Sequence, residues 1–297
     1  MSDEKRRAIA IGESLCVSLI WASSFIFVKV ALEDLGPLSI AGLRYFLGFL
    51  ILLPFLIRRG EQPRSKKPWL LLFAIGISAY GIGNGALFWG LKYLPATTVS
   101  FLMSLSPLLV LIGGVLWLKE IPAWRQVLGV VVSLLGSGLF FSAGLASGQI
   151  MGIVIVLIGL LGFMAFSLLG REIAGQDQLD TLTLTTIPLA FGGGVLLLVA
   201  IPFEGIPSLS LKPMGIVLWL AVVNTALGYL LYNHALRALT ALEMNMMLKL
   251  TPLGTALLAW WLLGEKLTLR QIVGMLIMIA GVIIVQAHAE RRPSSLL

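Results

Sequence analysis

The second half of this chain repeats the first half at a constant distance along the sequence. Residues 83–136 align with residues 228–281 at a single offset of 145, without a gap. The coincident residues include the pairs Gly83 and Gly228, Pro107 and Pro252, Glu120 and Glu265, Gly129 and Gly274, and Gly136 and Gly281. A duplicated chain folds into two similar units, which we expect at residues 1–145 and 146–297. Duplication of a strongly apolar chain favours a membrane transporter.

The composition indicates that the chain folds in a lipid bilayer. Hydrophobic residues make up 58% of the chain and charged residues 12%, whereas soluble domains contain about 25% charged residues. No polar stretch is long enough to form a separate soluble domain. The net charge of +7 would suit a nucleic-acid-binding protein, but the Lys and Arg residues lie between apolar runs and form no basic face. We therefore expect contact with lipid and none with nucleic acid.

Hydropathy and turn residues divide the chain into ten apolar runs, each about long enough to cross a membrane as a helix. The runs are 10–31, 38–57, 69–91, 96–118, 124–142, 150–170, 180–201, 214–236, 241–263 and 269–287. Barrel strands would be shorter and would alternate between polar and apolar residues. The first run follows Lys5-Arg6-Arg7, as in a signal peptide, but it extends to about Leu32 and predicts a retained helix. The predicted fold class is an all-α polytopic membrane protein.

The distribution of positive charge predicts the orientation. With the N-terminus inside, the inside segments carry fourteen Lys and Arg residues and the outside segments carry four. Positive residues are retained in the cytoplasm, so both termini are expected there. Five helices per repeat is an odd number, so the second repeat must be inverted in the membrane. Inverted repeats place a solute site between the two halves near the midplane, and this site opens to each side in turn.

Two cationic residues lie well inside the predicted spans, away from the span ends. Lys249 lies near the centre of the run 241–263, and Arg44 lies about two turns into the run 38–57. A charged residue at the centre of a membrane helix costs roughly 2.5–3.5 kcal/mol on insertion scales, so both are candidates for substrate contact. Arg44 is equally suited to tie helices together. Asn245 lies one turn before Lys249 and joins it as a candidate.

Polar and aromatic side chains recur at helical spacing in three other runs. The candidates for a substrate-binding wall are Trp21, Ser24, Tyr80, Asn84, Asn224, Tyr229 and Tyr232. Aromatic residues in membrane helices also serve simple packing, so both roles remain open for Trp21, Tyr80 and Tyr229. Pro107 and Pro252 occupy equivalent places in the two repeats, where each removes a backbone donor. They are either packing kinks or hinges for switching access.

Several motifs resemble those of a known family. They are the stretch 231–243 (LYNHALRALTALE), Thr251-Pro252-Leu253, Gly264-Glu265-Lys266, a looser copy beginning at Leu91-Lys92-Tyr93, and Trp21-Ala22-Ser23-Ser24-Phe25 in the first helix. In order and spacing they resemble EamA-type transporters of the drug/metabolite transporter superfamily. Trp21 and Arg44 have no clear counterparts in the second repeat, so substrate contacts in the first helices are not duplicated.

The resemblance implies ten helices in two inverted five-helix repeats, located in the bacterial inner membrane. It also implies export of small metabolites, often amino acids, without a cofactor. Cationic groups and aromatic rings suit neutral or aromatic amino acids, and we expect a monomer. A multidrug, nucleotide, sugar or lipid transporter of the same fold is the main alternative.

Two other classes of protein are less well supported by the sequence. An intramembrane enzyme would need a pattern such as His-Glu-x-x-His or Gly-x-Ser-x-Gly, and neither occurs. The two histidines, His234 and His288, are far apart, so no metal site is predicted. A channel would show conductance and no saturable, stereoselective uptake.

Overall fold

The computed structural model describes most of the chain. The described residues are 3–59, 66–94, 99, 102–103, 105–119, 121–140, 150–175, 179–207, 210–263 and 268–289. Within these ranges all regular elements are helices. Two residues of the repeat pattern, Glu120 and Glu265, lie outside them.

The first half of the chain contains long helices and two π-helical segments, in which the backbone winds more widely than in an α-helix. The elements are α1 (Asp3–Ala31), α2 (Pro37–Arg59), α3 (Lys66–Gly76) continuing through η1 (Ile77–Asn84) into α4 (Gly85–Tyr93), α6 (Ser106–Gly113) continuing into η2 (Gly114–Leu118), and α7 (Trp124–Phe140).

The second half follows the same order of elements. They are α8 (Ile150–Gly175), α9 (Thr181–Glu204), α10 (Leu211–Trp219) continuing through η3 (Leu220–Leu227) into α11 (Gly228–Ala235), α12 (Ala241–Leu248), α13 (Leu250–Leu263) and α14 (Leu269–Ala289). The π-helical segments η1 and η3 therefore interrupt the third helix of each half.

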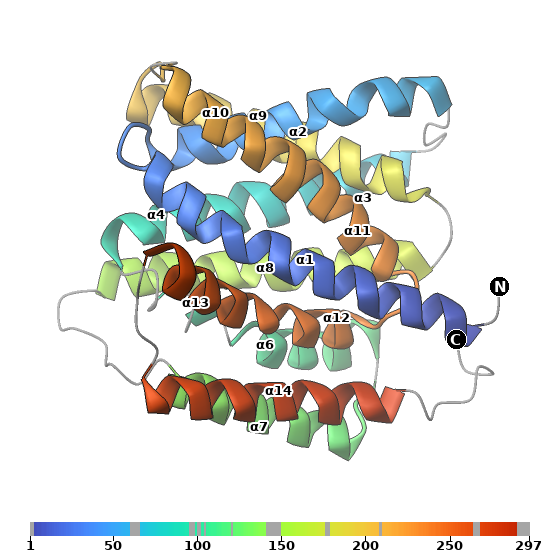
Figure 1. The fold of residues 1–297 in the computed structure, drawn as a ribbon. Coiled ribbons are helices and arrows are strands. Elements are labelled where there is room, and N and C mark those ends of the chain that lie inside the picture. The colour runs from blue at the N-terminus through green and yellow to red at the C-terminus, as the bar shows by residue number, and fades with distance from the viewer. Residues whose placement is uncertain are drawn as a thin grey trace.

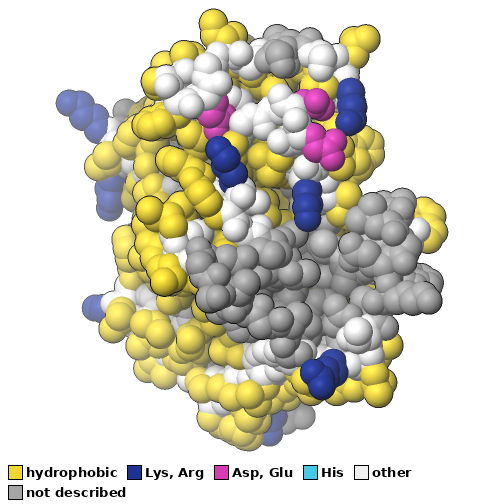
Figure 2. Space-filling model, turned by 90° about the vertical axis from the view of Figure 1, so that its left-hand side faces the viewer, with side chains coloured by type: hydrophobic (Ala, Val, Ile, Leu, Met, Phe, Trp, Pro, Cys, Tyr) yellow, Lys and Arg dark blue, Asp and Glu magenta, His cyan; other side chains and the backbone are white. Residues whose placement is uncertain are grey.

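The helices have the length and apolar surface of membrane spans. Within the described residues, six helices are long and apolar enough to cross a membrane, and three shorter apolar helices accompany them. Large hydrophobic side chains on several helices are exposed, as expected for contact with lipid. Figure 2 shows one end of the bundle, where charged side chains gather while hydrophobic side chains cover the flanks. Ten crossings in two repeats remain a prediction.

The helices pack side by side in a bundle (Figure 1). Helix α2 packs along α9, α7 packs along α14, and α1 contacts α11, α12 and α13. The first turn of α1 and the last turn of α14 lie at the same end of the bundle. Side chains from both halves form one main hydrophobic core.

The α7–α14 contact is built on glycines from both halves. A Cβ atom on Gly129 would lie 2.8 Å from the carbonyl oxygen of Gly281, and one on Gly136 would lie 2.8 Å from that of Gly274. In the reverse direction, a Cβ on Gly281 would lie 2.6 Å from the carbonyl oxygen of Gly129. Small residues allow two helix backbones to approach this closely.

Polar side chains cap the N-termini of three of the helices. The carboxylate of Glu204, at the end of α9, accepts hydrogen bonds from the backbone N–H groups of Leu38 and Ser39 in the first turn of α2. Asp180 caps α9 by accepting from the Thr183 N–H. Thr240 and Glu243 form a reciprocal capping box at the start of α12. These caps satisfy backbone donors that a helix end leaves without partners.

The continuous run expected at 241–263 is wrong in one respect. The extent is correct, but the chain forms two helices, α12 and α13, that meet at Lys249. The N–H group of Lys249 bonds three residues back, to Met246. Pro252 lacks an N–H group, so an unbroken helix would lose one hydrogen bond here in any case. Hydropathy does not register such a break because both parts are equally apolar.

Candidate functional site

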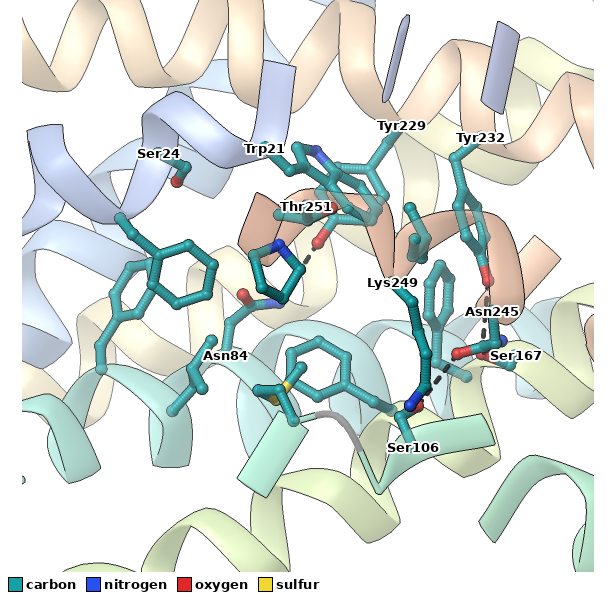
Figure 3. A pocket seen from close by; sticks show the side chains of 18 of the residues that line it. Trp21, Ser24, Asn84, Ser106, Ser167, Tyr229, Tyr232, Asn245, Lys249 and Thr251 are labelled. Atoms are coloured by element: carbon teal, nitrogen blue, oxygen red, sulfur yellow. Dashed lines mark hydrogen bonds between the residues drawn. The ribbon is translucent and has the colours of Figure 1, made fainter. Parts of the chain in front are cut away.

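A cavity of about 130 Å³ lies inside the bundle (Figure 3). Its wall combines α1, α2, α4 and α6 from the first half with α11, α12 and α13 from the second half, and α8 completes it. The sequence-predicted residues in the wall are Trp21, Ser24, Arg44, Asn84, Tyr229, Tyr232, Asn245 and Lys249, together with Pro107 and Pro252. These residues come from seven helical elements, namely α1, α2, η1, α6, α11, α12 and α13, and from the α12–α13 break, and they meet around one space.

Two predicted residues, Tyr80 and Asn224, lie behind the wall. Tyr80 is fully buried, and its ring centroid lies 4.7 Å from that of Tyr45 and 4.9 Å from that of Tyr229. The Asn224 amide donates to the carbonyl of Ile20 and to the hydroxyl of Ser23. Both residues pack against or bond to residues that line the cavity or lie next to them, so they support the wall from behind.

Arg44 is held by a set of neutral oxygens. Its Nε donates to the hydroxyl of Thr225 at 2.7 Å, its Nη1 donates to the hydroxyl of Ser24 at 2.7 Å, and its Nη2 donates to the carbonyl of Asn224 at 3.2 Å. The side chain is 3% exposed. Within the described residues, no carboxylate contacts it. A guanidinium carries five N–H donors, so two remain beyond these three bonds.

The π-helical segments supply carbonyl groups for this arrangement. In an α-helix the N–H of Gly228 would bond to the carbonyl of Asn224, four residues back. In η3 this N–H bonds to the carbonyl of Val223, five residues back, and leaves the Asn224 carbonyl for other donors. The Asn224 carbonyl instead accepts from the Trp21 indole at 2.9 Å and from Arg44. Segment η1 has an analogous bond, since the Asn84 amide donates to the carbonyl of Ala79 at 2.8 Å. Ala79 and Asn224 are 145 residues apart, which is the offset of the sequence repeat.

A second polar group centres on Asn245. Its carbonyl oxygen accepts from the hydroxyl of Ser106 at 3.0 Å, and its amide donates to the hydroxyl of Ser167 at 3.0 Å. Ser167 in turn lies 3.3 Å from the hydroxyl of Tyr232. These bonds join α6, α8, α11 and α12 at one side of the cavity (Figure 3).

Lys249 lies at the break between α12 and α13. Its side chain is buried, lines the cavity and donates to the hydroxyl of Ser137 at 3.3 Å. Within the described residues, no ion pair involves Lys249. Because the break places Lys249 where two short helices meet, its ammonium group faces the cavity from the middle of the predicted ninth span.

Pro107 and Pro252 occupy the first turns of α6 and α13, respectively. In this position the missing N–H group of proline is tolerated without loss of a helical bond. Each proline therefore begins a helix that starts inside the bundle. Whether either one acts as a hinge remains a prediction.

Aromatic rings cover one side of the cavity. The rings of Trp21 and Tyr232 stack with centroids 5.6 Å apart, and those of Phe166 and Tyr232 stack at 5.1 Å. Tyr229 lies against Trp21 at 4.9 Å in a tilted arrangement. Stacked rings form a flat apolar surface that suits the planar part of a ligand.

The wall residues that sequence reasoning did not single out include Ser106, Phe166, Ser167 and Thr251. Ser106 and Thr251 directly precede the repeated prolines. Their position next to two candidate residues could have marked them as wall residues. Ser167 is a polar residue within an otherwise apolar run of α8. Phe166 gave no signal, because phenylalanine is common throughout the chain.

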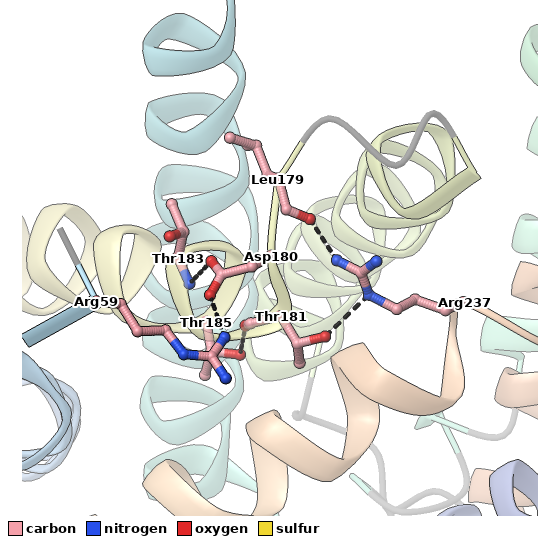
Figure 4. A network of polar contacts seen from close by, with 7 residues as sticks. All are labelled: Arg59, Leu179, Asp180, Thr181, Thr183, Thr185 and Arg237. Atoms are coloured by element: carbon pink, nitrogen blue, oxygen red, sulfur yellow. Dashed lines mark hydrogen bonds and ion pairs between the residues drawn. The ribbon is translucent and has the colours of Figure 1, made fainter. Parts of the chain in front are cut away.

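A separate polar network lies at the end of the bundle where α2 ends and α9 begins (Figure 4). Arg59 contacts the Asp180 carboxylate at 2.8 Å. Arg237 donates to the hydroxyl of Thr181 and to the carbonyl of Leu179. Partial burial acts to raise the pKa of the Asp180 carboxyl, but hydrogen bonds from Thr183 and Arg59 outweigh it and lower the pKa below 3.8.

Two further contacts join α1 to the second half. Arg7 pairs with Glu243 at 3.0 Å, and the carboxylate of Glu13 lies 2.8 Å from Nδ1 of His234. His234 thus lies beside a carboxylate on α1. Among the described residues, no three His, Cys, Asp or Glu side chains form a group that could hold a metal ion.

Several known proteins resemble this chain along nearly its whole length. An uncharacterized transporter of Archaeoglobus fulgidus is 28% identical over 92% of this chain and 96% of its own length. The uncharacterized transporter YoaV of Bacillus subtilis is 23% identical over 90% of this chain and 93% of its own length. An S-adenosylmethionine/S-adenosylhomocysteine transporter of Chlamydia trachomatis is 23% identical over 84% of this chain and 80% of its own length.

A solved crystal structure shares the fold. It superimposes with a TM-score of 0.79, covers 95% of this chain and 98% of its own chain, and is 16% identical in sequence. The model of the EamA-like transporter family matches residues 9–142 and again residues 150–286. These two matches account for most of the chain, which is a multi-pass membrane protein and belongs to the EamA-like transporter family.

Proposed function

We propose that this protein exports small metabolites, above all neutral and aromatic amino acids, across the bacterial inner membrane. The observation that carries the proposal is the cavity of about 130 Å³, which is lined by helices from both halves. A site shared by two halves can open to one side or the other when the halves move against each other.

Two sets of contacts support ten helices in two inverted repeats, at residues 1–145 and 146–297. Gly129 faces Gly281 and Gly136 faces Gly274, whereas the sequence repeat pairs Gly129 with Gly274 and Gly136 with Gly281. A two-fold axis produces this exchange of partners. If Gly129 of one half contacts Gly281 of the other, the axis carries that contact onto the pair formed by their repeat equivalents, Gly274 and Gly136. The contact between Asn84 and Tyr229, 145 residues apart, fits the same axis.

The wall chemistry supports a small substrate with a planar part and a carboxylate. The stacked rings of Trp21, Tyr232 and Phe166 offer a flat apolar surface. Arg44 and Lys249 attract a carboxylate. Amino acids with aromatic side chains combine both parts in a small volume.

The contacts at one end of the bundle support a conformation closed at that end. Arg7 with Glu243 and Glu13 with His234 tie α1 to α12 and α11. Positive charge in the adjoining segments is expected to keep this end, with both termini, in the cytoplasm. The cavity would then open to the cytoplasm when these two contacts separate.

A second candidate is a larger metabolite that carries an amino acid together with a nucleoside. The relative named as an S-adenosylmethionine/S-adenosylhomocysteine transporter favours it. The cavity argues for a smaller substrate in this conformation, since an apolar cavity of about 150 Å³ is just sufficient for benzene. Multidrug transport by the same fold would be recognised by competition from hydrophobic cations.

The test is uptake of radiolabelled amino acids by liposomes that contain the purified protein, with and without a pH gradient. Saturable, stereoselective uptake of aromatic or neutral amino acids is expected. Lys249→Ala should reduce this uptake by about tenfold or more, and Lys92→Ala, at an exposed position, serves as the matched control. Absence of uptake for every amino acid under both conditions would rule out the proposed substrate class.

A further inference from the structure

We infer that the cavity favours organic anions, in which an aromatic or similarly flat body carries a carboxylate, over the corresponding amino acids, which add an ammonium group. The inference rests on the proposed transport function and ranks the carboxylate without an ammonium group ahead of the amino acids that the protein is proposed to export. It follows from the charges around the cavity, from the hydrogen-bond donors that remain in its wall and from the volume available.

The charges that line the cavity have one sign. Arg44 and Lys249 are the charged residues in the described part of the wall, and both are buried. Both bond to hydroxyl or carbonyl oxygens, and neither contacts a carboxylate among the described residues. Buried cations in a medium of low dielectric constant are unfavourable without an opposite charge. An anion in the cavity supplies that charge.

The carboxylates of neighbouring helices are engaged elsewhere. Glu243 pairs with Arg7, Glu13 contacts His234, and Glu204 binds the first turn of α2. Asp180 binds Arg59 at one end of the bundle. An amino-acid ammonium would therefore find aromatic rings and neutral oxygens in the cavity, beside two existing positive charges.

The donors in the wall also favour an anion. The first turns of α6 and α13 line the cavity, and a helix N-terminus presents backbone N–H groups and a partial positive charge. The hydroxyl of Thr251, in the first turn of α13, is buried and has no hydrogen-bond partner among the described residues. Thr251 and Lys249 both belong to the wall of the cavity.

The volume limits the size of the body. A cavity of about 130 Å³ is close to the ~150 Å³ in which benzene binds to an engineered protein cavity. One ring fills most of this space, so the carboxylate of a ring with a short chain would extend beyond it toward Lys249. The ring would lie against Trp21, Tyr232 and Phe166.

The experiment compares ligands that share a ring and a chain length and differ in charge. 3-Phenylpropionate is the anion, phenylalanine the zwitterion, 3-phenylpropanamide the neutral compound and phenethylamine the cation. Binding to the purified full-length protein at pH 7 is measured by competition against radiolabelled 3-phenylpropionate. We expect 3-phenylpropionate to bind about 10- to 100-fold more tightly than phenylalanine. Both ligands offer a carboxylate to the cations of the wall, but only phenylalanine brings an ammonium group that these cations repel. Phenethylamine is expected to bind most weakly.

Variants test whether Lys249 is responsible. Lys249→Met keeps the length of the side chain and should remove most of the preference for the anion, whereas Lys92→Met, at an exposed position, should keep it. If Lys249→Met does not fold, the comparison of the four ligands on the unmodified protein still tests whether the cavity prefers the anion. Phenylalanine binding as tightly as 3-phenylpropionate would overturn the inference and leave the proposed function intact. Lack of binding by all four compounds, with no amino-acid uptake in liposomes, would overturn both.

Discussion

The amide of Asn84 donates a hydrogen bond to the hydroxyl of Tyr229 at 3.2 Å, and the two residues are 145 positions apart. The same number is the offset of the sequence repeat, so each residue is the other's counterpart. Counterparts that touch each other are expected close to the two-fold axis that we propose for the two halves. The cavity includes both residues in its wall, so the proposal places the cavity close to that axis as well.

The Asn84–Tyr229 bond predicts different effects for its two partners. Tyr229→Phe removes one bond and should lower the free energy of unfolding by about 1 kcal/mol. Asn84→Ala should lower it by about 1–3 kcal/mol, because the carbonyl of Ala79 loses its side-chain donor too. Thermal unfolding in detergent measures both variants. Additive effects in the double variant would show that the two side chains are not coupled.

Two glycines of α7 provide a matched pair for the α7–α14 contact. Gly136→Ala should destabilise the protein by about 1–3 kcal/mol, because its Cβ would lie 2.6 Å from the Met278 backbone nitrogen. Gly138→Ala adds a Cβ with nothing within 4 Å and should be neutral or slightly stabilising. Melting temperatures of the two variants in the same detergent make the comparison. Equal melting temperatures would contradict the close approach of the helices.

Arg44→Lys tests whether the positive charge or the branched geometry is required. Lysine is a compact charge on a flexible chain and does not reproduce three divergent bonds. Since Thr225, Ser24 and Asn224 would lose a common donor, a loss of about 2–3 kcal/mol in stability is expected. Arg58→Lys, at an exposed position, should have little effect. A stable Arg44→Lys variant would mean that only the charge matters.

The Asp180–Arg59 contact predicts a dependence of stability on pH. The folded protein lowers the Asp180 pKa from 3.8, so the contact stabilises the fold fully above this value. That contribution is lost as the pH falls through the lower pKa of the folded state. Asp180→Asn keeps a helix cap but removes the charge. Its melting temperature should lie slightly below that of the unmodified protein at pH 7, since exposed pairs contribute only about 0–1 kcal/mol. The difference should shrink as the pH falls below 3.8.

The helices were predictable because their signals are local. Apolar runs bounded by turn residues placed the spans to within a few residues, as for Pro37–Arg59 against the predicted 38–57. The break at Lys249 and the π-helical segments were not predictable in this way. Both depend on how the backbone is satisfied by distant groups, such as Trp21 and Arg44 at the Asn224 carbonyl.

The cavity was predictable in part for a similar reason. Charged residues within apolar runs stand out, and Arg44 and Lys249 both reach the wall. Tyr80 and Asn224 share helices with wall residues but lie outside the wall, because the buried part of each helix is wider than the part that meets the cavity. Ser167 reaches the wall from α8, where the other residues of the predicted run 150–170 are apolar. Which face meets the cavity is decided by packing between helices.

The break between α12 and α13 makes position 249 a suitable place to alter selectivity. A residue in the middle of an intact helix is constrained by the preference for helix-forming side chains and by the neighbours one turn away. Lys249 lies between two helices that each begin or end there, so these constraints are relaxed. Exchange of the residue at this one position is therefore expected to change the charge of the cavity wall while the bundle that surrounds it stays unchanged.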